Sequence, residues 1–359
     1  MSYERTLWMQ FVREIPQLKE WLNYGFVSVG HKIYILGYSD KTDRFEVLIF
    51  DAKNYSLRSV DFPDQSENSS VPALKSFFAV SHSKKIYICG SKSPNSFAAR
   101  HVHCLDTETM EWTDTDALGD IPQGKMWGAA CVVGNKIYIC IDYFVNVSEG
   151  KPRMYALDLR TKIWTCQCRH TWSLRLTPRG TVAFGRRIYV LFIKWTNIGD
   201  NNDCIGCYDT SEGSWRWLDP PGSSTCFGPS WTIFDHGEDV YILLSDVFMM
   251  ATERLVYPYS DEDGHEKIFL KYSTRRDQWG QVKYKGSPPG RQFDSVIVIE
   301  DKVFLFCSIY KEAYMLDFFP SLRSLSLEAV NHHELDIACL PAGLKNEILQ
   351  STTHSASSK

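Results

Sequence analysis

The chain has 359 residues, 44% of them hydrophobic and 14% aromatic, so it can bury a large core. Its formal net charge of -4 excludes a general electrostatic attraction to nucleic acid or to an anionic membrane and leaves only local charge recognition. No uncharged stretch approaches the roughly 20 residues of a membrane-spanning helix, and Glu4 and Arg5 interrupt any apolar signal core.

The 11 cysteines are odd in number and lie mostly among apolar residues, as in Ile88-Cys89 and Ile139-Cys140. That placement suits reduced, buried thiols better than a disulfide framework. We therefore expect a protein of the cytoplasm, the nucleus or both.

One motif recurs along the chain: a turn with Gly or polar residues, followed by an aromatic residue between aliphatic residues. Its first copy covers residues 29–35, and the aromatic residues of successive copies are 53, 51, 51, 52 and 63 positions apart. These anchor aromatics are Tyr34, Tyr87, Tyr138, Tyr189, Tyr241 and Phe304. A period of this length is typical of the blades of a β-propeller.

Each unit carries a second mark, an aliphatic strand that ends in Asp with Trp six residues later. Complete copies are Asp106 with Trp112, Asp158 with Trp164, and Asp209 with Trp215. Two other units keep the spacing with one substitution each, Leu57 after Asp51 and Ser273 before Trp279. Short strands of this kind cannot bury their faces alone, but sheets stacked around an axis can, so we predict an all-β, six-bladed propeller.

The sixth unit lacks its last strand, because Arg323 stands where Trp is expected, whereas the N-terminus offers an extra strand around Trp8. We predict that this N-terminal strand closes blade six, so that no sheet edge stays open. The predicted propeller covers residues 5–318, a helical tail covers 319–350, and 351–359 are expected to be disordered.

The strand pattern ends at Pro320, and apolar or small residues then recur at helical spacing over 321–330. A second apolar set follows a polar break, at Leu340, Leu344 and Ile348. Composition alone favours two short helices that pack on the propeller.

The repeats resemble kelch repeats, although the double glycine after the second strand of each unit survives only as Gly37 and Gly90. In the tail, one set of residues resembles the elongin-C-binding box and a second set resembles the cullin-2 box. These are Ser321, Leu322, Ser326 and Val330 for the first, and Leu340, Pro341, Leu344 and Ile348 for the second. Ser326 departs from the box, where the small residue is commonly Cys.

Both boxes, in order and directly after six kelch-like units, resemble the kelch-domain substrate receptors of cullin-2 ubiquitin ligases. The resemblance implies a non-catalytic receptor that binds elongins B and C and cullin-2, with ubiquitin transfer performed by partner subunits. It also implies that the propeller's channel mouth binds the C-terminus of a target protein through arginines and hydroxyls. An Arg side chain suits this task because its guanidinium matches a carboxylate with two parallel hydrogen bonds.

Counting back 13 residues from each anchor aromatic reaches the turn before the innermost strand. The count gives Trp21, Leu74, Lys125, Leu176, Gly228 and Arg291, of which only two are basic. We add two cations from neighbouring positions and two possible aromatic walls: Lys75, Arg179, Trp127 and Trp231. The alternative for each cation is a solvated surface position, and for each Trp ordinary packing.

No cofactor or metal is expected. Cys204 and Cys207 have metal-ligand spacing, but no second Cys pair or spaced His pair completes a four-ligand zinc site. Phosphate-binding loops and nucleophile motifs are also absent from the sequence. The competing function is a kelch interaction scaffold, cytoskeletal or chromatin-associated, that does not join a ligase.

Overall fold

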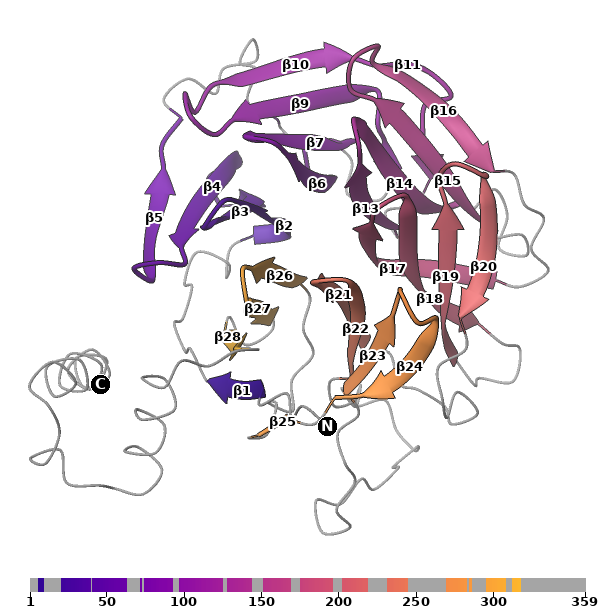
Figure 1. The fold of residues 1–359 in the computed structure, drawn as a ribbon. Helices are drawn as coiled ribbons and strands as arrows, with labels where there is room; N and C mark the ends of the chain where they lie inside the picture. Colours follow the sequence, from indigo (N-terminus) through magenta and orange to yellow (C-terminus); the bar gives the residue numbers. More distant parts are fainter. Residues whose placement is uncertain are drawn as a thin grey trace, which may run out of the picture.

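The computed structural model describes residues 6–9, 21–39, 41–62, 72, 74–92, 97–124, 128–143, 151–168, 175–195, 202–218, 231–244, 269–282, 284–285, 295–307 and 312–317. Every regular element in these ranges is a β-strand, and six antiparallel sheets stand around a common axis (Figure 1). The predicted six-bladed propeller is confirmed. The segment after residue 317, with the predicted helical tail, lies outside the described residues.

Each blade runs outward from an inner strand to an edge strand. Blade one contains β2 (Trp21–Val29), β3 (Lys32–Ser39), β4 (Arg44–Asp51) and β5 (Ser56–Val60). Blade two contains β6 (Ser76–His82), β7 (Lys85–Ser91), β9 (His101–Asp106) and β10 (Trp112–Asp116). Blade three contains β13 (Gly128–Val133), β14 (Lys136–Tyr143), β15 (Lys151–Asp158) and β16 (Ile163–Cys168).

The second half of the ring repeats this order. Blade four contains β17 (Arg175–Phe184), β18 (Arg187–Trp195), β19 (Asn202–Asp209) and β20 (Ser214–Leu218). Blade five contains β21 (Trp231–His236), β22 (Asp239–Leu244), β23 (Phe269–Ser273) and β24 (Gln278–Gln281). Blade six contains β26 (Ser295–Ile299), β27 (Lys302–Cys307), β28 (Glu312–Asp317) and, from the N-terminus, β1 (Thr6–Met9).

The ring closes through hydrogen bonds between the two ends of the propeller. Strand β1 lies antiparallel to β28, with Trp8 opposite Leu316, and forms the fourth strand of blade six (Figure 1). The inner strands β2, β6, β13, β17, β21 and β26 contact one another in that cyclic order. The chain therefore returns to its first blade without a covalent link, and β28 has no open edge along this ladder.

Two short strands connect neighbouring blades along the rim, which the sequence pattern did not predict. Strand β11 (Leu118–Gly119) follows blade two and pairs in parallel with β16 of blade three. Strand β25 (Tyr284–Lys285) follows blade five and pairs in parallel with β1 of blade six. A third short pair joins β8 (Phe97–Ala98) to β12 (Gln123–Gly124). The strand after a blade thus covers part of the next blade's edge.

Because strands alternate in direction, the turn between the first and second strands of each blade lies on one side of the ring, here called the turn face. In blades one to five the turn between the third and fourth strands lies on the same side. The first of these turns, between the inner strand and the second strand, contains a left-handed residue in every blade. These residues are Gly30, Ser83, Gly134, Gly185, Gly237 and Glu300. The connections on the opposite side, here called the loop face, carry most of the segments outside the described residues.

An Asp ends the third strand of every blade except blade five, and in blades one to four this Asp organises the second tight turn. Asp106 accepts the backbone N–H groups of Glu108 and Thr109 at 3.0 and 3.3 Å, and these bonds hold its pKa below the usual range. Lys85 stands directly opposite Asp106 in the ladder. The same Lys or Arg opposite Asp recurs in blades one, three, four and six, as Lys32–Asp51, Lys136–Asp158, Arg187–Asp209 and Lys302–Asp317. The repeated Asp is therefore a turn-forming residue.

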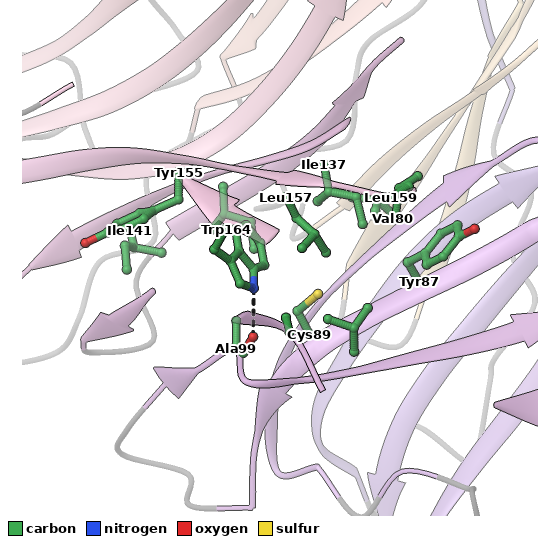
Figure 2. Packing of buried hydrophobic residues seen from close by; sticks show 13 residues of the cluster. Val80, Tyr87, Cys89, Ala99, Ile137, Ile141, Tyr155, Leu157, Leu159 and Trp164 are labelled. Carbon is green, nitrogen blue, oxygen red and sulfur yellow. Dashed lines mark hydrogen bonds between the residues drawn. The ribbon is translucent and has the colours of Figure 1, made fainter. Parts of the chain in front are cut away.

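The core consists of apolar seams between adjacent blades. Figure 2 shows one seam, where Tyr87 and Cys89 of blade two face Leu157 of blade three. Trp164 is buried in this seam and donates its indole N–H to the backbone carbonyl of Ala99 at 2.9 Å (Figure 2). The conserved spacing from Asp to Trp within a blade thus places the indole against the preceding blade.

Candidate functional site

Arg179 lies on the inner strand of blade four, toward the loop face. The ladder between β17 and β18 changes register between Pro178 and Gly180, so Arg179 is the extra residue of a β-bulge. Its side chain is half-buried, and its Nε atom is inaccessible to solvent. Bulges change the direction of a side chain and often occur beside binding sites. Gly180 lets blade five approach, because a Cβ there would lie 2.8 Å from Ile233.

Two buried residues with hydroxyl side chains lie at equivalent positions on the inner strands of blades two and four. Ser76 pairs with Ser91, four residues beyond the anchor Tyr87, and Thr177 pairs with Ile193, four residues beyond the anchor Tyr189. Ser76 is 0% exposed and Thr177 4% exposed. The Ser76 Oγ atom has no hydrogen-bond partner among the described residues, which is unusual for a buried hydroxyl.

Lys75 lies beside Ser76 at the loop-face end of blade two. Its ammonium group stands 4.8 Å from the centroid of the Tyr38 ring in blade one, and the Tyr38 hydroxyl donates to the Asp43 carboxylate. The cation is thus held over an aromatic face, an arrangement that stabilises it and restricts its position. Lys75 and Arg179 both stand at the loop-face side of inner strands, with blade three between them.

A neighbouring pair of contacts holds Glu46 at the same end of blade one. The Trp21 indole N–H donates to Glu46 Oε2 at 3.0 Å, and the Thr42 hydroxyl donates to Glu46 Oε1 at 2.8 Å. Gly37 makes this packing possible, because a Cβ there would lie 2.0 Å from the Trp21 ring. The two surviving kelch glycines therefore have a steric role: Gly90 likewise lies against the backbone of Ser76.

The other predicted substrate-binding residues are placed less fully. Lys125, Trp127 and Arg291 lie outside the described residues, and for Trp231 only the backbone, at the start of β21, is described. At the position 13 residues before the anchor, Trp21, Leu74 and Leu176 are buried apolar residues. In these three blades that position belongs to the core, so the count alone does not select residues that contact a ligand.

Four residues of this region were not predicted from the sequence: Ser76, Thr177, Asp43 and Glu46. When the units are aligned on their anchor aromatics, Ser76 and Thr177 differ by one position. The bulge at Arg179 accounts for this one-residue difference. The contact between Lys75 and Tyr38 joins different blades, and no local pattern indicates it.

The Cys204–Cys207 pair does not form a chelating arrangement. Both residues lie on β19, where an odd spacing places side chains on opposite faces. Cys207 accordingly packs in the seam with blade five, and Cys204 packs against the seam with blade three. No group of three potential metal ligands occurs among the residues that the structure describes.

Known proteins resemble this chain over nearly its full length. It is 24% identical to kelch domain-containing protein 3 from Bos taurus, Mus musculus and Homo sapiens, over 93% of this chain and 94% of each relative. The chain is a six-bladed β-propeller that is similar to kelch-repeat proteins. The resemblance to kelch-repeat proteins that the sequence predicted is confirmed. No protein-family model matches the chain.

The match to these relatives continues beyond the propeller. A match over 93% of the chain is longer than residues 1–317 could provide, so it includes part of the segment after the last described strand. Among the described residues, no helix is long and apolar enough to cross a membrane.

Proposed function

We propose that this kelch propeller is the substrate-recognition subunit of a cullin-2 RING ubiquitin ligase and binds C-terminal segments of target proteins at its loop face. It is non-catalytic in this proposal, works in the cytoplasm or nucleus, and joins the ligase through elongins B and C. The observation that carries the proposal is the order of two box-like patterns in the tail, at Leu322 to Val330 and at Leu340 to Ile348. The continuation of the kelch match into this segment supports it.

The loop face supplies the chemistry that a free carboxylate needs. Arg179 offers a guanidinium at a bulge, and Lys75 offers a positioned ammonium group. Charge-assisted hydrogen bonds of this type are stronger than neutral ones. We infer that these groups contribute to the carboxylate site.

Capture of elongins tests the ligase role directly. The tagged full-length chain is co-expressed with elongins B and C, and wild type is compared with Leu322→Lys and with Leu327→Lys. Leu327 lies off the apolar face of the predicted helix, so its variant is a control for the same charge change. We expect wild type and Leu327→Lys to capture elongins and Leu322→Lys to lose them. Failure of the folded wild-type chain to capture them would favour the interaction scaffold.

A peptide experiment tests the carboxylate site. A library of peptides with free C-termini and its amidated counterpart are applied to wild type, Arg179→Gln and Arg160→Gln. Arg160 is exposed at the turn face, which makes it a control for loss of one positive charge. We expect selection of free C-termini by wild type and by Arg160→Gln, and a loss of roughly tenfold or more for Arg179→Gln. Equal retention of amidated peptides by wild type would contradict this site.

A further inference from the structure

On each inner strand, one residue pairs with the anchor aromatic of the second strand. The next residue toward the turn face is the subject here, and over the six blades these residues form a ring. Each member pairs with the aliphatic residue just before its anchor. The members, here called the axial ring, are Ser28, Ser81, Val132, Ala183, Asp235 and Val298. All six are half-buried. Because both faces of each inner strand pack against neighbouring blades, the remaining exposure is toward the axis.

On each inner strand, the four-residue segment that ends at the axial ring was chosen for comparison of charge. Asp235 is the only charged residue in these six segments. The residues compared are 25–28, 78–81, 129–132, 180–183, 232–235 and 295–298, which contain no other Asp or Glu and no Lys or Arg. The middle of the ring is therefore apolar or neutral, with a single carboxylate on blade five.

The Asp235 carboxylate forms no ion pair with a Lys or Arg among the described residues. Burial raises its pKa, and only its own backbone N–H and the neighbouring His236 act in the opposite direction. His236 itself forms an ion pair with Asp301 at 3.2 Å. A half-buried carboxylate without a cation is unfavourable for the folded state, so its presence requires a compensating gain.

The Asp235 carboxylate acts electrostatically on a residue of blade three as well as on its own strand. Cys131 lies on the inner strand of blade three, two blades away, and Asp235 adds to the rise of the pKa of Cys131, which burial brings to about 12. An electrostatic effect between blades that are not neighbours is expected when both groups border the axis.

We propose that Asp235 is the anion of a binding site on the propeller axis that takes a guanidinium or primary ammonium group. Such a ligand group provides the positive charge that the compared residues of the inner strands lack, and it hydrogen-bonds to a carboxylate in a site of low dielectric constant. The hydroxyls of Ser28 and Ser81, in the same ring, provide further acceptors. Asp235 lies between three and four residue positions from Arg179 along the strand direction, roughly 10–13 Å at the rise of a β-strand, so the two proposed sites are separate.

An organic cation fits this ring better than a metal ion. Divalent metals in proteins are held by several carboxylate, carbonyl or imidazole ligands, whereas the axial ring offers one carboxylate and two hydroxyls. A guanidinium is more weakly hydrated than an ammonium group and suits a partly apolar site.

Binding of defined probes to the full-length chain tests the proposal. Isothermal titration calorimetry is performed with agmatine, with the blocked peptide acetyl-Gly-Arg-Gly-amide, and with the neutral peptide in which Gln replaces Arg. The proteins are wild type, Asp235→Asn and Glu300→Gln; Glu300 is exposed at the turn face, so its variant loses the same charge outside the ring. Agmatine represents a free small cation, and the Arg peptide represents a side chain of a protein ligand.

We expect wild type and Glu300→Gln to bind at least one cationic probe, and Asp235→Asn to bind it roughly tenfold or more weakly. The neutral peptide is expected not to bind. Labelling of carboxyl groups with a carbodiimide and an amine, read by mass spectrometry, is expected at Asp235 and reduced by the bound probe. Absence of binding to folded wild type, or equal binding by Asp235→Asn, would overturn the proposal.

Discussion

The indole N–H of Trp164 donates to the backbone carbonyl of Ala99, 2.9 Å away, across the seam between blades three and two. Both groups are buried, and the short rim strand β11 runs past them on its way to β16. The hydrogen bond, the rim strand and the Lys162 ammonium group, which stands 5.5 Å from the centroid of the Tyr87 ring, add polar contacts to the apolar seam between these two blades.

Trp164→Phe keeps an aromatic ring in this seam but removes the donor. We expect a loss of about 1–3 kcal/mol in the free energy of unfolding, because the carbonyl of Ala99 stays buried without its partner. Trp164→Ala is expected to lose about 3–5 kcal/mol, since it also leaves a cavity. Denaturation in urea, followed by tryptophan fluorescence and circular dichroism, measures both. Equal stability of wild type and Trp164→Phe would show that the hydrogen bond contributes nothing net.

Gly90→Ala is expected to be destabilising by about 1–3 kcal/mol, because the new Cβ would lie 2.1 Å from the carbonyl oxygen of Ser76. Gly280→Ala is the matched control: a Cβ at Gly280 meets no atom within 4 Å, so stability should change by no more than about 0.5 kcal/mol. The difference in urea midpoint between the two variants checks the steric role of the kelch glycine. Similar midpoints would contradict it.

Asp277→Asn tests the contact between blades four and five. The Arg216 guanidinium, 2.6 Å from Asp277, and the Tyr272 hydroxyl hold the pKa of Asp277 at about 2. Because the folded pKa is below the unfolded value of about 3.9, the stabilisation is present above that value and is lost as pH falls toward 2. The carboxylate is 56% exposed, so we expect less than about 1 kcal/mol.

Urea midpoints of wild type and Asp277→Asn, measured from pH 6 down to pH 2, follow this loss. The two midpoints should differ at pH 6 and approach each other as pH falls through the window between the two pKa values. A difference that stays constant over this range would assign the effect to something other than ionisation.

Asp235→Asn is expected to stabilise the fold at neutral pH. Burial raises the pKa of Asp235 in the folded state, so the unfolded chain loses this proton first and the ionised carboxyl opposes folding as pH rises. The gain should be present above the folded pKa and should disappear below the unfolded value of about 3.9. Thermal denaturation at pH 7 and pH 3 measures it. A variant less stable than wild type at pH 7 would mean that the carboxylate has a structural partner.

Deletion of residues 1–9 tests ring closure. The deletion removes β1, exposes the edge of β28 and leaves β25 without its partner, so we expect a lower thermal midpoint and concentration-dependent association. Deletion of residues 1–4, which precede β1, is the control and should leave both properties unchanged. Analytical ultracentrifugation and thermal denaturation distinguish the two chains.

Much of the fold could be predicted from residue order because the repeating elements are local. Each inner turn with its anchor aromatic, such as Gly134 with Tyr138, and each Asp followed by its turn, such as Asp158, depends on residues within a few positions. Their spacing set the number of blades, since strands of this kind bury both faces only when the sheets stack in a ring.

The candidate site depends on pairing between distant segments, which residue order alone does not reveal. The bulge that isolates Arg179 is a property of the β17–β18 register, and the contact of Lys75 with Tyr38 joins two blades. The position before the anchors that looked suited to ligand contact proved to be core at Leu74 and Leu176, because packing against the neighbouring blade decides where a side chain is buried. The sequence by itself thus determined the architecture, and tertiary packing decided which polar groups stand at the loop face and which, such as Asp235, lie half-buried on the inner strands.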